Sequence, residues 1–185
     1  MPKAMVLDSS LPGTSAEALQ LLSSRDFICT RHMTSGWAEA MIERHVATDS
    51  TVEFTIQTPV TLLSIPPDVR SLFRHPALMT RMEHWVRGAD EIRGTFGMSC
   101  TAFPSTFIGT YRARDRAGGI DLHFEAEVRV PVVMVGARLE RAWIDAFVPR
   151  MKRELAIWAT HLERVGEQIT GSERRTRRRD RATAA

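Results

Sequence analysis

The chain has 185 residues and a mass of 20.8 kDa, which is the size of one domain. Its composition, 43% hydrophobic and 25% charged, is typical of a globular domain, and the absence of any run of 18 apolar residues excludes a membrane-spanning helix. The apolar patch at residues 4–7 is too short for the core of a signal peptide, so we expect a cytoplasmic protein. Cys29 and Cys100 stand far apart and suggest no disulfide framework.

The net charge of +3 is unevenly distributed along the chain. Residues 171–185 hold six arginines and two acidic residues, which leaves 19 basic and 20 acidic residues in the rest. A basic groove for nucleic acid is therefore not indicated in the folded part. We expect a domain at residues 1–168 and a disordered Arg-rich tail at 169–185. The alternative role for the tail is weak contact with polyanions or an anionic membrane, but without aromatic residues between its arginines it predicts no specific nucleic-acid binding.

Helical signals follow a short first strand near residues 4–7. Thr14 and Glu17 have the spacing of a capping box, which predicts a helix that starts at residue 15. A second short helical piece is expected around residues 24–29, and Gly36 ends the helical stretch.

Alternation of apolar and polar residues dominates the middle of the chain and predicts strands. A turn at residues 65–68 and one helical turn at 69–73 interrupt the pattern. The cleanest alternation, apolar on one face and charged on the other, is the last strand and is typical of an antiparallel sheet. The expected strands are 38–46, 52–56, 79–86, 92–102, 107–113 and 121–130.

The strongest pattern is an apolar stripe with helical spacing after Gly136. It comprises Leu139, Trp143, Phe147, Met151, Leu155, Trp158, Leu162 and Val165. Pro149 lies inside it and lacks a backbone donor, so we expect a kink or a break there. The segregation of strands and helices predicts an α+β fold in which a curved antiparallel sheet of about six or seven strands wraps around one long C-terminal helix.

Three stretches carry a resemblance to a known superfamily: residues 65–73 (IPPDVRSLF), 83–85 (EHW) and 130–140 (VPVVMVGARLE). In these stretches and in the order of its elements over residues 4–165, the chain resembles the START-like (SRPBCC, helix-grip) superfamily, and within it a bacterial family of unknown function. The resemblance implies a helix-grip fold with an internal cavity. It implies no reaction, because the superfamily includes lipid carriers, cyclases, co-chaperones and dioxygenase subunits.

Apolar residues on the expected inner faces are the candidates for a ligand cavity. Their alternative role is simply to form the core, although the small Gly109 and Ala126 leave room for a ligand between larger side chains. The candidates are Phe54, Ile56, Trp85, Phe96, Met98, Phe107, Tyr111, Phe124, Trp143 and Phe147.

Arg44 and His84 are the polar cavity candidates, because each shares strand parity with apolar neighbours. If those faces point inward, both side chains would orient the polar end of a ligand. A twist or bulge that turns both outward is the alternative, and we prefer it. Strand 79–86 stays ambiguous, since Trp85 on its other face is equally suited to the interior.

No catalytic or metal-binding motif is present among the six histidines, and no phosphate-binding glycine motif occurs. The carboxylates beside His123, at Glu125 and Glu127, lie on the charged face of their strand and are expected to meet solvent. We therefore expect no metal and no cofactor, and favour a protein that binds a lipid-like or polyketide-like ligand. The alternatives are a cyclase- or dehydratase-type enzyme that uses Arg44, His84 or Tyr111, and a ligand-free interaction module.

Overall fold

The computed structural model describes residues 3–37, 39–60, 77–102 and 104–183, with the backbone alone from residue 167 onward. Seven strands and three helices follow one another along these residues. The strands are β1 (Lys3–Leu11), β2 (Met41–Ala47), β3 (Thr51–Val60), β4 (Ala77–Arg87), β5 (Glu91–Cys100), β6 (Thr106–Arg116) and β7 (Gly119–Arg129). The helices are α1 (Ser15–Leu22), α2 (Arg25–Thr34) and α3 (Gly136–Thr183). The turn and helical turn expected at 65–73 lie outside the described residues.

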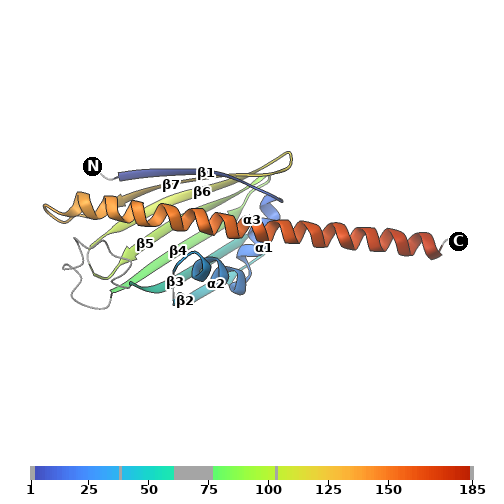
Figure 1. The fold of residues 1–185 in the computed structure, drawn as a ribbon, viewed down its shortest axis with the longest axis horizontal. Coiled ribbons are helices and arrows are strands. Elements are labelled where there is room, and N and C mark those ends of the chain that lie inside the picture. The colour runs from blue at the N-terminus through green and yellow to red at the C-terminus, as the bar shows by residue number, and fades with distance from the viewer. Residues whose placement is uncertain (1–2, 38, 61–76, 103, 184–185) are drawn as a thin grey trace.

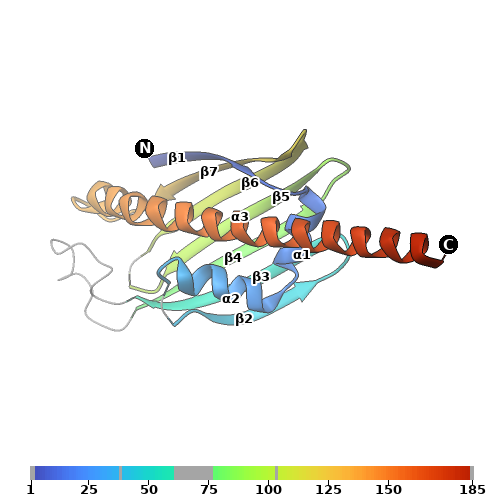
Figure 2. The same ribbon diagram turned by 45° about the vertical axis from the view of Figure 1, so that its right-hand side comes forward.

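The strands form one antiparallel sheet in the order β1-β7-β6-β5-β4-β3-β2. Helix α3 runs across one face of this sheet, and α1 and α2 lie on the same side (Figures 1 and 2). Apolar residues of that inner face and of the three helices make a single core. The predicted α+β, helix-grip fold is thus confirmed.

The helix starts are built as the sequence predicts. Thr14 accepts a hydrogen bond from the Glu17 backbone N–H at 3.2 Å, and the Thr14 backbone N–H donates to the Glu17 carboxylate at 2.8 Å. These two bonds satisfy amides that the first turn of α1 leaves without helical partners. At the start of α2 the Ser24 hydroxyl accepts a hydrogen bond from the Phe27 backbone N–H at 3.3 Å. Gly36, with a φ of 100°, turns the chain toward β2.

A bulge in β2 turns Arg44 away from the interior. Ile42 pairs with Ile56 but Arg44 already pairs with Thr55, so Glu43 is an extra residue that reverses the alternation. Arg44 therefore lies on the outer face, 61% exposed in its side chain, and forms a surface ion pair with Glu53 at 3.5 Å. Its prediction as a cavity residue is wrong, and the alternative that a bulge turns it outward is confirmed.

The register of β4 places His84 outside as well. Glu83 and Trp85 pair with the buried Phe54 and Val52, whereas His84 pairs with Glu53. His84 is exposed, because the odd-numbered residues of this strand segment face the core. The ambiguity in strand 79–86 is resolved in favour of Trp85, and the assignment of His84 to the cavity is wrong.

Gly109 was expected to leave space for a ligand, but it serves the contact between strands. A Cβ atom at this position would lie 2.4 Å from the Glu125 carbonyl oxygen and 2.6 Å from the Ala126 Cβ. The small side chains of Gly109 and Ala126 thus let β6 and β7 approach each other.

Helix α3 is continuous through Pro149, so the break expected there does not occur. Pro149 and Asp145 are both exposed. The carbonyl of Asp145, which loses its helical donor, therefore lies on the solvent side of the helix, where water can hydrate it.

Beyond the sheet, α3 extends through residues 169–183 (Figure 1). Arginine and glutamate are good helix formers, and no proline follows Pro149 to end the helix. The division into a domain at 1–168 and a dispensable Arg-rich tail stays a prediction. The helices of the described residues contain no apolar stretch that would suffice for a membrane span.

Removal of the Arg-rich segment is expected to leave the fold intact. In Figures 1 and 2 this part of α3 projects beyond the sheet and the other helices. A chain that ends at Gly171 should therefore melt at the same temperature as the full chain, and circular dichroism at 222 nm should lose helical signal only in proportion to the residues removed. A clear fall in the melting temperature would show that the segment stabilises the domain.

Candidate functional site

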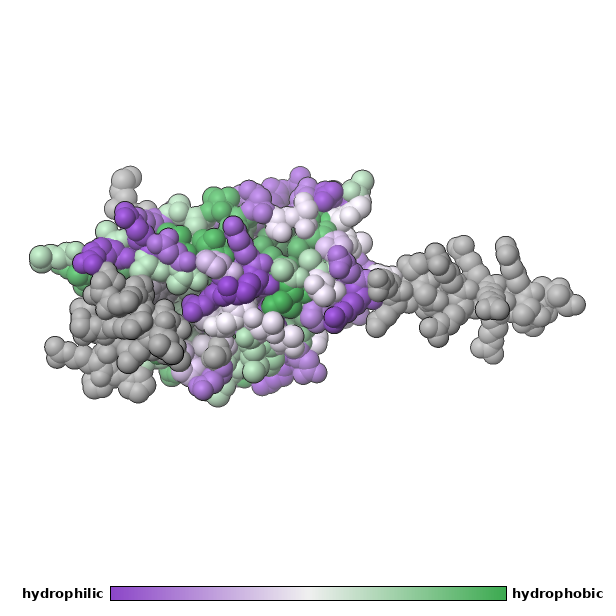
Figure 3. All heavy atoms as spheres, viewed as in Figure 1, coloured by the Kyte–Doolittle hydropathy of each residue, from purple (hydrophilic) through white to green (hydrophobic). Residues whose placement is uncertain are grey.

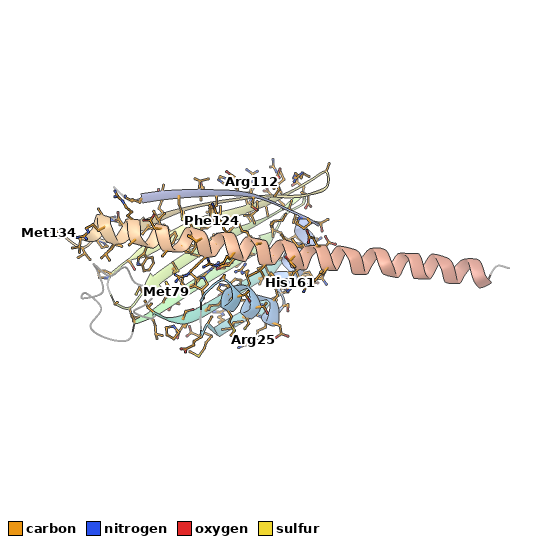
Figure 4. All side chains as sticks on the ribbon, in the orientation of Figure 1. Arg25, Met79, Arg112, Phe124, Met134 and His161 are labelled. Carbon is orange, nitrogen blue, oxygen red and sulfur yellow. The ribbon has the colours of Figure 1, made fainter. Side chains whose placement is uncertain are left out.

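The interior between the sheet and α3 holds a group of apolar side chains near the end where α3 begins. We call Met79, Met98, Phe107, Trp143 and Phe147 the apolar end. The strand register sets Met98 opposite Phe107, and Met79 opposite Cys100, near the ends of β4, β5 and β6 on that side of the molecule. Trp143 and Phe147 reach the same region from the first turns of α3. Figure 4 shows Met79 in this half of the molecule and His161 toward the other half.

Aromatic rings fill the centre of the inner face. The rings of Phe107 and Phe147 lie edge to face with centroids 4.6 Å apart, and Tyr111 stacks on Phe124 at 4.4 Å. Phe96 meets Phe147 at 5.5 Å. These rings are packed as a core. Met79 and Trp143, at the outer margin of the apolar end, remain the more accessible of its residues.

Several apolar residues at that outer margin remain half-buried. Met79 and Trp143 belong to the apolar end, and the strand-to-helix connection adds Val132 and Val135. Met134, which Figure 4 labels just before the start of α3, is an exposed apolar residue at the same end of the molecule, and this end carries apolar surface in Figure 3. Half-buried apolar side chains beside a core can gain further burial from a ligand.

A cluster of buried charges lies next to the aromatic centre. We call Arg31, Arg81, Glu83 and Glu154 the charge cluster; its side chains are at most 4% exposed. Arg81 donates to both carboxylate oxygens of Glu154, from Nη1 at 2.8 Å and Nη2 at 2.9 Å. Its Nε donates to Glu83 at 2.7 Å. One arginine of β4 thereby links its own strand to α3.

Arg31 of α2 completes the cluster from the other side. Its Nη2 donates to the two oxygens of Glu83 at 3.1 and 3.2 Å, and its Nε lies 3.6 Å from Glu154. Indole groups supply further donors: Trp85 to Glu83 at 2.8 Å and Trp37 to Glu154 at 2.9 Å. Two cations and two anions thus form a closed, neutral network across α2, β4 and α3.

The charge cluster shifts the pKa of its own carboxylates and of two neighbouring groups, Tyr111 and His32. Burial alone would raise the pKa of Glu83 and of Glu154, but Arg31 and Arg81 outweigh it and hold both pKa values below the usual 4.5. Burial and Glu83 raise the pKa of Tyr111 well above 10. Burial and the two arginines lower the pKa of His32 well below 6.5. These shifts favour charged carboxylates at Glu83 and Glu154 and neutral side chains at Tyr111 and His32, which is the arrangement that keeps the buried network neutral.

His32 should make the protein less stable as the pH falls through its unfolded-state pKa, near 6.5. In the unfolded chain its pKa is near 6.5, whereas the folded protein keeps it neutral, so each fall in pH favours the unfolded state. The loss should approach about 1.4 kcal/mol per pH unit below pH 6.5. Glu83 and Glu154 add a loss only below their unfolded pKa, at lower pH.

Urea unfolding at several pH values measures this effect. His32→Phe keeps a ring beside Phe54 and should flatten the pH dependence in that window. His84→Gln, on the exposed face, is the control and should leave the dependence as it is in the natural protein. Equal pH dependence in all three proteins would contradict the assignment to His32.

The ten predicted cavity residues all lie on the inner side of the sheet and α3, and their contact with a ligand stays a prediction. Nine are buried and Trp143 is half-buried. The charge cluster was missed. A usable signal was present, because once Trp85 faces inward its strand neighbours Arg81 and Glu83 must do so too. Glu154 similarly follows Phe147 by seven residues on the apolar face of α3.

Among the residues that the structure describes, no three His, Cys, Asp or Glu side chains gather as a metal site would require. Cys29 and Cys100, the latter buried in β5, form no disulfide with each other.

Several solved structures share this fold. The Zhui aromatase/cyclase from Streptomyces sp. R1128 is 10% identical, with a TM-score of 0.58 over 89% of this chain and 95% of that chain. The protein TTHA0849 from Thermus thermophilus is 8% identical, with a TM-score of 0.58 over 88% and 99%. An uncharacterized protein from Rhizobium leguminosarum is 13% identical, with a TM-score of 0.51 over 85% and 95%. At such identities the likeness shows a common START-like fold and nothing more specific.

No match was found among curated proteins. A family described as a protein of unknown function, DUF2505, matches residues 7–162, which confirms the expected membership of a family of unknown function. The chain belongs to the DUF2505 family.

Proposed function

We propose that the protein binds a hydrophobic small molecule between the sheet and the first turns of α3. The observation that carries this proposal is the apolar end, where Trp143 stays half-buried beside the packed rings of Phe107 and Phe147. Met79 is half-buried against the same core. Aromatic and thioether side chains form adaptable apolar surfaces. The Streptomyces aromatase/cyclase of similar fold supports the proposal by analogy alone.

An enzyme of the cyclase or dehydratase type is the less favoured alternative. Arg44 and His84, the polar residues that such an enzyme would use to orient its substrate, lie on the outer face of the sheet. Tyr111 is buried and its hydroxyl accepts a hydrogen bond from Arg81 at 3.4 Å. Since Arg81 is itself engaged by two carboxylates, these groups stabilise one another rather than a reacting substrate.

Displacement of an uncharged apolar dye tests the proposal. N-phenyl-1-naphthylamine should fluoresce more strongly with the native protein, and dodecanol or phenanthrene should displace it. Trp143→Ala removes apolar surface from the site and should weaken the binding of the dye by about tenfold. This loss corresponds to about 1.4 kcal/mol, which is less than the free energy gained when a large apolar side chain is fully removed from water.

Ile108→Ala is the matched control, because Ile108 is 60% exposed on the outer face of β6. It should leave dye affinity unchanged. If the native protein never enhances the fluorescence, or if both variants weaken it equally, the ligand does not bind at the apolar end, and the ligand-free interaction module becomes the better hypothesis.

A further inference from the structure

Two arginines of α3 converge on the turn between α2 and β2. A Cβ atom placed on Gly36 would lie 3.3 Å from Nη2 of Arg153 and 4.0 Å from Nε of Arg150. The two guanidinium groups therefore approach the same point. Gly36, which has no side chain and a φ of 100°, keeps that point open.

Both arginines are held in place by neutral groups. The Cζ of Arg150 lies 4.6 Å over the ring of Trp37, a cation–π contact. Arg153 donates from Nε to the Ser35 carbonyl at 3.0 Å. Within the described part of the chain, no carboxylate forms an ion pair with Arg150 or Arg153. The guanidinium N–H groups that make no contact with Trp37 or Ser35 therefore have no anionic partner among these residues.

The charges around Arg150 leave it short of compensation. Burial and the neighbouring Arg153 lower its pKa, and only Glu154 acts in the opposite direction. Glu154 already accepts two hydrogen bonds from Arg81 and one from Trp37. Two like charges brought together at a partly buried site favour an anion between them.

This arginine pair adjoins the apolar end. Trp37, under Arg150, also lies against Phe147, with ring centroids 6.5 Å apart. Arg150 follows Phe147 by three residues, which is one turn along α3. A molecule with its apolar part beside Phe147 would thus bring a polar end to the rim at Arg150.

We propose that Arg150 and Arg153 bind the oxyanion head group, a carboxylate or a phosphate, of an amphipathic ligand. The planar fork of N–H donors on each arginine matches the oxygens of such groups. This inference rests on the proposed function, since the apolar part of the ligand occupies the apolar end. It also supplies the polar anchor that the site needs, because the burial of a small apolar surface alone gives weak binding once the cost of association is subtracted.

Competition between ligands with one chain and different head groups tests the proposal. Dodecanol, dodecanoate and dodecyl phosphate displace N-phenyl-1-naphthylamine from the natural protein and from Arg150→Gln, Arg153→Gln and Lys152→Gln. Dodecanoate, dodecyl phosphate or both should bind the natural protein about tenfold more tightly than dodecanol. The preference should vanish in Arg150→Gln and Arg153→Gln. It should persist in Lys152→Gln, which removes an exposed charge from the same turn.

A second readout separates anion binding from a merely structural role. The carboxyl carbon of carbon-13-labelled dodecanoate reports its own titration by NMR. Its pKa should be lower in the complex with the natural protein than in the complex with Arg153→Gln, because a cation pair favours the charged form. Since Arg153 is exposed, that variant should fold even if Arg150→Gln does not.

The outcomes distinguish the two proposals. If dodecanol displaces the dye and neither anionic ligand binds more tightly, the apolar site stands and the arginine pair is not an anion site. An equal preference for the anions in Arg153→Gln and the natural protein overturns the inference in the same way. If none of the three ligands displaces the dye, the proposed function fails, and the inference fails with it.

Discussion

Arg81→Met should destabilise the protein by about 3–5 kcal/mol, because it leaves two buried carboxylates with one arginine between them. Glu83 and Glu154 are almost fully buried and each accepts hydrogen bonds from Arg81. The free energy of unfolding in urea, measured near neutral pH, gives the loss directly.

Arg44→Met is the matched control, since it removes the same group from an exposed ion pair with Glu53. It should cost at most about 1 kcal/mol. The double variant Arg81→Met with Glu154→Gln removes one charge of each sign and keeps an acceptor for the Trp37 indole. It should recover much of the loss, as neutral replacements of buried pairs often do. Similar small losses for Arg81→Met and Arg44→Met would show that the cluster is not what ties α2, β4 and α3 together.

Trp85→Ala should cost about 3–5 kcal/mol, the range for a fully buried aromatic side chain. Its ring stacks on Tyr111 at 4.6 Å and meets Trp158 edge to face at 5.6 Å. Its indole N–H also donates to Glu83. Trp143→Ala, the same change at a half-buried position, should cost less. Thermal and urea unfolding of both variants compare them.

Gly94 offers an independent check on the Trp85 packing. A Cβ atom there would lie 2.8 Å from two ring carbons of Trp85. Gly94→Ala should therefore destabilise the natural protein but cost little in a Trp85→Ala background, where the ring is gone. Additive losses in the double variant would contradict this contact.

The sequence predicted the order of the elements because period and capping are local properties. The Thr14–Glu17 capping box, the alternation in β7 and the stripe of α3 each act within one element. Strand faces were harder, since one inserted residue reverses them: Glu43 in β2 moved Arg44 outward. In β4, where both faces carry polar residues, only the pairing with Val52 and Phe54 decides the register.

The sequence pattern can place members of the charge cluster on inner faces, but it cannot show that they contact one another, because they are far apart along the chain. Arg31 and Glu83 are 52 residues apart, and Arg81 and Glu154 are 73 apart. A single arginine or glutamate on an otherwise apolar face has two explanations. Either an irregularity in the strand or helix turns it toward solvent, or it is buried in an ion pair, and the sequence does not distinguish them. The convergence of Arg150 and Arg153 on Gly36 likewise depends on how α3 lies beside the α2–β2 turn.

The most direct test of the account uses the methionines as reporters of where an apolar ligand binds. Met79 and Met98 belong to the apolar end, whereas Met33, Met41 and Met82 are more than half exposed. With methyl carbon-13 methionine and NMR, titration with dodecanol should shift the Met79 and Met98 resonances in a saturable manner and leave the exposed three in place. Saturation without shifts at Met79 and Met98, or shifts confined to the exposed methionines, would contradict a ligand site between the sheet and α3.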